Sequence, residues 1–292
     1  MREYFDLQDE ITKEIVVELR VEVGVGEGTR ASANATDNFE AWTNVAKGME
    51  LCLKLNKEDN IKARALFEAA IKLDPGYAGA WKWLARSYQF DARLGWSESR
   101  AASMKRAHEL ALKALALDDK NAGAHAMLGG IYQDQRQLEK SISEYKISIS
   151  LAPNFSQGYA QLAGAMNLMG EFEESITLIK TAMRLSPYYD HWYLAYLARA
   201  YFFTGRYEEA IAACNQRLDR CRKGECPIWG PLAMLAQVYA ELGRMEEARA
   251  FMAEALEINP KLSLAFYRRR DPYKNTAHLQ QLLDAASKAG LK

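Results

Sequence analysis

Several features that mark common classes of protein are missing from this chain. Its 38 basic and 38 acidic residues cancel to a formal net charge of zero, whereas a general nucleic-acid binder carries a basic excess. The most apolar segment, residues 191–205, contains Arg199 and is too short to span a membrane. The first ten residues are acidic, unlike a secretory leader. We therefore expect a soluble, cytoplasmic chain with neither nucleic acid nor membrane among its partners.

Motifs for metal binding and catalysis are also missing. The four histidines are scattered, without an HExxH pair or a neighbouring acid at ligand spacing. The four cysteines show no CxxC pairing, so we expect reduced thiols rather than a zinc site. A disulfide between Cys221 and Cys226 under oxidation is the alternative. We predict no catalytic residue, no metal and no cofactor, and hence a protein that is not an enzyme.

The chain does contain a period of 34 residues. Asp119, Pro153 and Pro187 are separated by this distance, and each closes a stretch with similar residues at the same offsets. In the copy that begins at Ala122, small residues stand at positions 8, 20 and 27 and larger ones at positions 7, 11 and 24. Small residues let two antiparallel helices approach closely, and the larger ones fill the space between them. The pattern resembles the tetratricopeptide repeat.

Six such copies can be aligned between residues 37 and 260 once insertions are allowed. The second copy has about ten extra residues, around Asp91 to Arg100, between its helices. In the fifth copy, the second helix is expected to continue through Arg222. We predict an all-α fold, a right-handed α-solenoid of about six helix pairs. An amphipathic helix and a flexible linker are expected in residues 1–36, and a C-terminal cap with a final helix in residues 261–292.

The two ends resemble a particular family. The segments Phe5–Ile11 and Asn38–Trp42, and the ending from Leu282 to Leu291, are similar to the carboxyl-terminal region of bacterial class III adenylate/guanylate cyclase-related proteins. In that family, a cyclase or DNA-binding domain is commonly followed by a TolB-like domain and then by tetratricopeptide repeats. The resemblance implies that residues 1–36 include the end of a TolB-like domain. Because no cyclase catalytic segment is present, it does not imply cyclase activity.

The same repeat family suggests where a partner would bind. Its first helices line a concave groove, and side chains at positions 2, 5, 6, 9, 12 and 13 point toward it. Aromatic residues and arginine are enriched at protein-binding hot spots, although a groove aromatic can also be packed in the core. The family's clamp for carboxyl-terminal peptides is not expected, because Arg86 replaces an asparagine of that motif. Transferred position by position, the candidate groove residues are Lys82, Trp83, Arg86, Gln89, Gln133, Gln161, Asn167, Tyr196, Arg199 and Phe202.

Three functions are compatible with these observations. The first is a non-enzymatic scaffold that binds a protein or peptide segment in its groove, as a regulatory module of a bacterial signalling protein. The second is a homo-oligomer in which the N-terminal helix docks onto another copy. The third is a sensor of a small anionic ligand held by Trp83, Arg86 and Arg199. Partner, signal and oligomeric state are not determined by the residue pattern.

Overall fold

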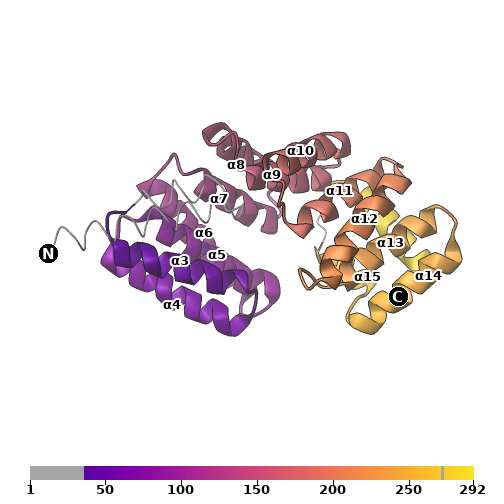
Figure 1. Cartoon of the computed structure of the whole chain (residues 1–292), viewed down its shortest axis with the longest axis horizontal. Helices are drawn as coiled ribbons and strands as arrows, with labels where there is room; N and C mark the ends of the chain where they lie inside the picture. Colours follow the sequence, from indigo (N-terminus) through magenta and orange to yellow (C-terminus); the bar gives the residue numbers. More distant parts are fainter. Residues whose placement is uncertain (1–35, 271–272) are drawn as a thin grey trace. The chain divides into compact units, whose positions relative to one another are not determined.

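The computed structural model describes residues 36–270 and 273–292, and these residues form helices joined by short turns (Figure 1). No strand occurs in this part of the chain. The prediction of an all-α fold is therefore confirmed. The helices in chain order are α3 (Phe39–Leu53), α4 (Lys57–Leu73), α5 (Ala78–Leu94), α6 (Arg100–Leu117), α7 (Ala122–Asp134), α8 (Leu138–Leu151), α9 (Ser156–Met169), α10 (Phe172–Leu185), α11 (His191–Phe203), α12 (Tyr207–Arg222), α13 (Trp229–Glu241), α14 (Met245–Ile258), α15 (Leu264–Arg270) and α16 (Thr276–Lys288).

Helices α3 to α14 follow one another as six consecutive pairs, and small residues bring the two helices of a pair together. A Cβ added to Gly129 on α7 would stand 2.8 Å from the ring of Tyr145 on α8. In the first pair, a Cβ on Gly48 would stand 2.4 Å from the ring of Phe67. In these two pairs, a glycine on the first helix is thus required by direct contact with an aromatic ring on the second helix.

Short polar side chains define where several helices begin. The side chains of Asn38, Asn56, Ser99 and Asn121 each accept a hydrogen bond from a backbone N–H three residues further on. Such a side chain satisfies one of the N–H groups that the first turn of a helix leaves without an intrahelical partner. The extra residues of the second repeat lengthen its helices, because α5 continues to Leu94 and α6 begins at Arg100.

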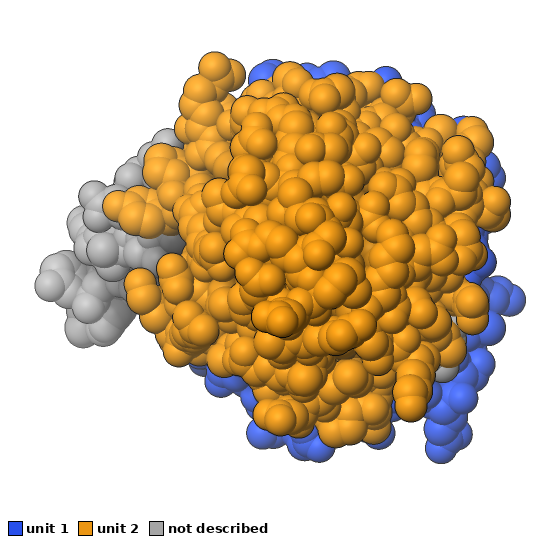
Figure 2. All heavy atoms as spheres, turned by 90° about the vertical axis from the view of Figure 1, so that its right-hand side faces the viewer, with its two compact units in different colours: residues 1–158 blue, residues 159–292 orange. Residues whose placement is uncertain are grey.

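The chain divides into two compact units, residues 1–158 and residues 159–292 (Figure 2). The first unit has a core that includes Phe67, Tyr77 and Met127, and the second a core that includes Phe202 and Leu232. The amphipathic helix and linker that we predict in residues 1–36 lie outside the described residues, apart from Thr36. At the other end, α16 forms the predicted final helix and buries Leu282 and Leu283.

The expectation of reduced thiols is wrong for two of the four cysteines. Cys221, in the last turn of α12, and Cys226 form a disulfide whose Cα atoms are 4.4 Å apart. The chain reverses between them at Gly224, where φ is +92°, a conformation that glycine adopts readily. An ion pair also connects the two sides of the turn: Nε of Arg220 donates to Glu225 Oε2 at 2.6 Å. Disulfides are typical of oxidising compartments, so this bond does not favour the expected cytoplasmic location.

Candidate partner-binding surfaces

In the first unit, the candidate residues lie on one face of α5. Lys82, Arg86 and Gln89 are spaced by four and three residues, so consecutive helical turns bring them together. The side chains of Lys82 and Arg86 are half-buried. Within residues 36–270 and 273–292, neither cation forms an ion pair with a carboxylate, and the one hydrogen bond of the Arg86 guanidinium goes to Gln89.

Burial determines the electrostatics of this face. It lowers the pKa of Lys82 to about 8, an effect that the positive charge of Arg86 increases and Asp118 opposes. Burial and then repulsion from Arg93 lower the pKa of Arg86 as well. A cation that loses water without gaining a counter-ion is destabilised. Both side chains would therefore gain from an acceptor that a partner supplies.

The buried side chain of Gln89 links this face of α5 to α7. Its Nε2 donates to Asp134 Oδ2 on α7 at 2.7 Å, and its Oε1 accepts from Arg86 Nη1 at 3.1 Å. The same carboxylate lies 3.6 Å from Nε of Arg93. Because Gln89 is fully buried, it cannot contact a partner as we predicted. It orients Arg86 instead. Asp134 forms its ion pair with Arg93, and its charge also partly opposes the lowering of the Arg86 pKa.

Aromatic rings border the two cations. The Arg86 guanidinium carbon lies 5.7 Å from the ring centroid of Phe90, and Lys82 Nζ lies 5.5 Å from the ring of Trp83. Trp83 also stacks on Phe67 in the core, at 6.2 Å between centroids, and remains half-buried. Gln133, on α7, is half-buried too. The face thus combines an arginine with aromatic rings, which are residue types enriched at protein interfaces, and places a lysine beside them.

In the second unit, the corresponding face is covered by the chain's own C-terminal segment. Nη1 of Arg199 on α11 donates to the hydroxyl oxygen of Tyr273 at 3.1 Å. The backbone N–H of Lys274 donates to the carbonyl oxygen of Leu168, near the end of α9, at 2.9 Å. Tyr273 is buried, with 7% of its surface exposed. The segment that leads into α16 therefore occupies the place where a partner was predicted to contact Arg199.

Helix α16 continues this coverage along α13. Nε2 of Gln237 donates to the carbonyl oxygen of Leu282 at 3.4 Å, and Lys288 pairs with Glu241 at 3.0 Å. Leu282 and Leu283, on α16 itself, are buried. The final helix that we predict therefore packs along α13, the first helix of the last pair. The repeat pattern gave no signal for Tyr273 or His278, because neither falls within a repeat.

The remaining candidates of the second unit differ in burial and in the contacts that they make. Nδ2 of Asn167 donates to the carbonyl oxygen of Tyr196 at 2.9 Å, which ties α9 to α11, and Asn167 is 3% exposed. Tyr196 is half-buried against Gly164, where a Cβ would stand 2.6 Å from its ring. Phe202 has no exposed surface, so its assignment to the groove is corrected to the core. Gln161 is half-buried, and its Oε1 has no hydrogen-bond partner within the described residues.

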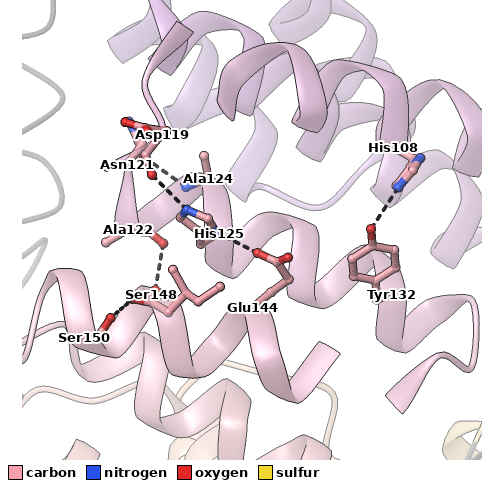
Figure 3. A network of polar contacts seen from close by, with 11 residues as sticks. His108, Asp119, Asn121, Ala122, Ala124, His125, Tyr132, Glu144, Ser148 and Ser150 are labelled. Carbon is pink, nitrogen blue, oxygen red and sulfur yellow. Dashed lines mark hydrogen bonds and ion pairs between the residues drawn. The ribbon is translucent and has the colours of Figure 1, made fainter. Parts of the chain in front are cut away.

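His108 of the second helix pair and His125 of the third make structural contacts (Figure 3). Nδ1 of His125 lies 2.7 Å from Glu144 Oε2 on α8, and its Nε2 lies 3.0 Å from the carbonyl oxygen of Asp119. His108 contacts the Tyr132 hydroxyl at 3.5 Å. Where the structure describes side chains, no three His, Cys, Asp or Glu residues are grouped to hold a metal ion. None of the described helices is long and apolar enough to cross a membrane.

Comparison with known proteins agrees with the helix pairs. The tetratricopeptide repeat family model matches residues 122–155, 194–222 and 231–262. A solved structure titled as a tetratricopeptide repeat protein from Parabacteroides merdae superimposes with a TM-score of 0.53, at 14% identity over 87% of this chain and 95% of that one. Three segments of the chain therefore match the tetratricopeptide repeat, and the fold is that of a helical repeat protein.

Two further similarities are partial. The crystal structure of the Cut9–Hcn1 hetero-tetramer of the APC/C gives a TM-score of 0.64 at 19% identity, covering 89% of this chain and 45% of that one. A Rhizobium meliloti (strain 1021) protein named "Putative adenylate cyclase 3" is 28% identical over 141 residues, which is 48% of this chain. The match spans only 24% of the length of that relative.

Proposed function

We propose that the chain is a non-enzymatic protein-interaction scaffold, and that its first unit binds a partner segment over Lys82, Trp83 and Arg86. The observation that carries this proposal is the pair of half-buried cations without a carboxylate partner. A carboxylate or carbonyl oxygen of a partner would offset the unfavourable free energy of desolvating Lys82 and Arg86. Trp83 and Phe90 would add apolar contact at the same place.

The proposal includes a place in bacterial signalling. The relative from Rhizobium meliloti, named as an adenylate cyclase, supports a regulatory role beside an output domain. The Cut9–Hcn1 structure, which is a hetero-tetramer, supports the use of this fold in a complex with another protein. In this proposal, the second unit has a different role, because the chain's own segment 273–288 covers the face that corresponds to the half-buried one in the first unit.

A capture experiment with a matched control tests the proposal. Full-length wild type, a Lys82→Ala/Arg86→Ala variant and a Lys62→Ala/Arg106→Ala variant are immobilised and exposed to a bacterial lysate. Like the first variant, the control loses one lysine and one arginine, but at exposed positions. A protein that the wild type and the control retain, and that the first variant loses, is then purified. We expect its affinity to fall at least tenfold in the first variant.

Circular dichroism and denaturation midpoints must show that all three proteins remain folded. Equal recovery of every captured protein from all three would contradict the proposed surface. Light scattering on the same samples would then test the homo-oligomer that the sequence leaves as an alternative.

A further inference from the structure

The two units carry the same pair of residues at the same place in their repeats. Arg86 and Phe90 are the ninth and thirteenth residues of α5, counted from Ala78. Arg199 and Phe203 are the ninth and thirteenth residues of α11, counted from His191. Because residues four apart lie on one face of a helix, each arginine stands one turn before its phenylalanine.

In the second unit, this pair holds a tyrosine of the chain itself. The Tyr273 hydroxyl accepts a hydrogen bond from Arg199 at 3.1 Å. The Tyr273 ring meets the Phe203 ring edge to face, with 5.4 Å between centroids and an interplanar angle of 68°. Edge-to-face contacts and a hydrogen bond from a cation to a hydroxyl are both favourable, and together they fix the ring in two directions.

In the first unit, the equivalent pair holds no such residue among those described. The guanidinium of Arg86 lies over the Phe90 ring at 5.7 Å, and its one hydrogen bond goes to the Gln89 side chain. A guanidinium has five N–H donors, so the capacity to bind a hydroxyl remains. Both Arg86 and Phe90 are half-buried, which leaves part of each within reach of a partner.

We infer that Arg86 and Phe90 hold a tyrosine of the partner segment, in the way that Arg199 and Phe203 hold Tyr273. This inference rests on the proposed function and names the chemistry of the partner. The tyrosine hydroxyl accepts from Arg86, and the ring packs edge to face on Phe90. A phenylalanine would fill the same space but leave the half-buried guanidinium without its acceptor, which is unfavourable.

Lys82 adds a second feature to the partner. It lies one turn before Arg86 on the same face, about 6 Å along the helix axis. The second unit has Ala195, without a charge, at the corresponding position of α11. The partner segment of the first unit therefore meets a cation that the segment held by the second unit does not meet. An aspartate or glutamate within one or two residues of the tyrosine suits this cation.

The test uses a defined probe and the full chain. The probe is a fluorescein-labelled peptide of residues 273–280 with Lys274→Glu, together with the same peptide carrying Tyr273→Phe. Fluorescence anisotropy is measured with wild type, Arg86→Met, Arg199→Met and the exposed control Arg106→Met. We expect the tyrosine peptide to bind wild type, Arg199→Met and Arg106→Met equally, and Arg86→Met about tenfold more weakly. The phenylalanine peptide should bind wild type about fivefold more weakly, with no further loss on Arg86→Met.

Three outcomes would overturn the inference. The first is equal binding of the tyrosine and phenylalanine peptides to wild type. The second is loss of binding in Arg199→Met but not in Arg86→Met, which would place the peptide on the second unit in exchange for the chain's own segment. The third is no saturable binding up to about 1 mM peptide. If the captured partner still depends on Lys82 and Arg86, the preference for tyrosine fails alone and the proposed function stands.

Discussion

Gly170, in the turn after α9, lies directly against the imidazole of His278 in α16. A Cβ at Gly170 would stand 2.7 Å from His278 Cε1, and the φ of this residue is +96°. The His278 ring also contacts Phe172 and Phe203, at 4.9 Å and 5.4 Å between centroids. Glycine is thus required here for two independent reasons, a left-handed backbone and the contact that anchors the C-terminal segment.

Gly170→Ala should destabilise the second unit more than the corresponding change one repeat later. Gly205 also has a left-handed backbone, with φ of +72°, but a Cβ there would meet nothing within 4 Å. Gly205→Ala should therefore lower the free energy of unfolding by about 1–2 kcal/mol from backbone strain alone. Gly170→Ala should lower it by at least about 1 kcal/mol more. Urea denaturation measures both, and His278→Ala should remove most of the difference between them.

Tyr273→Phe should lower the free energy of unfolding by about 1–2 kcal/mol, because it removes the acceptor of a hydrogen bond from a cation. The matched control is Tyr188→Phe, since Tyr188 is 84% exposed and should show no change. Thermal and urea denaturation of the three proteins provide the comparison. Equal stability of all three would mean that the Arg199–Tyr273 hydrogen bond does not hold the segment in place.

Thiol titration should find two free cysteines in the unfolded, unreduced chain. Cys52 and Cys214 are buried thiols whose pKa values burial raises to about 11 and about 12. They should therefore react slowly with a thiol reagent in the native protein, because the thiolate is the reactive form. After unfolding, two thiols should react, and four after reduction, since Cys221 and Cys226 are joined. Four reactive thiols without reduction would contradict the disulfide.

Repetition explains what the sequence could predict. Each copy repeats the small and large positions of its neighbours, so the six helix pairs, the long α12 and the places of Lys82 and Arg86 on α5 follow from the register. The register places a residue on a face but does not determine its burial. Gln89 and Phe202 occupy the same repeat position, and both are fully buried, one bound to Asp134 and the other packed in the core.

The C-terminal segment could not be predicted in this way, because it has no counterpart in the repeats. The pattern of Leu279, Leu282 and Leu283 indicates a helix that caps the array. The hydrogen bonds of Tyr273 and Lys274 depend on tertiary contacts with α11 and α9, which no local spacing encodes. Cys221 and Cys226 come together only because α12 continues to Arg222 and the chain then turns at Gly224.

Replacing Lys82 by methionine should stabilise the free protein at pH 7, although it removes a residue that we assign to the partner surface. The folded state lowers the pKa of Lys82 from 10.5 to about 8, so it disfavours the charged form. Below pH 8 the Lys82 charge therefore lowers the free energy of unfolding by its full amount. Between pH 8 and 10.5 this loss of stability decreases, because only the unfolded chain keeps the proton on Lys82. Above pH 10.5 the loss is absent. The free energy of unfolding of Lys82→Met should therefore exceed that of wild type by about 1–2 kcal/mol at pH 7.

The advantage of Lys82→Met over wild type should then shrink as the pH rises from 8 toward 10. Urea denaturation at several pH values measures this, with Lys62→Met as the control because the Lys62 side chain is 67% exposed. A residue that reduces stability in the free protein but strengthens binding is typical of a functional surface. A constant difference between wild type and Lys82→Met across this pH range would show that Lys82 is not held in a desolvated position, and would remove the main argument for a partner at this face.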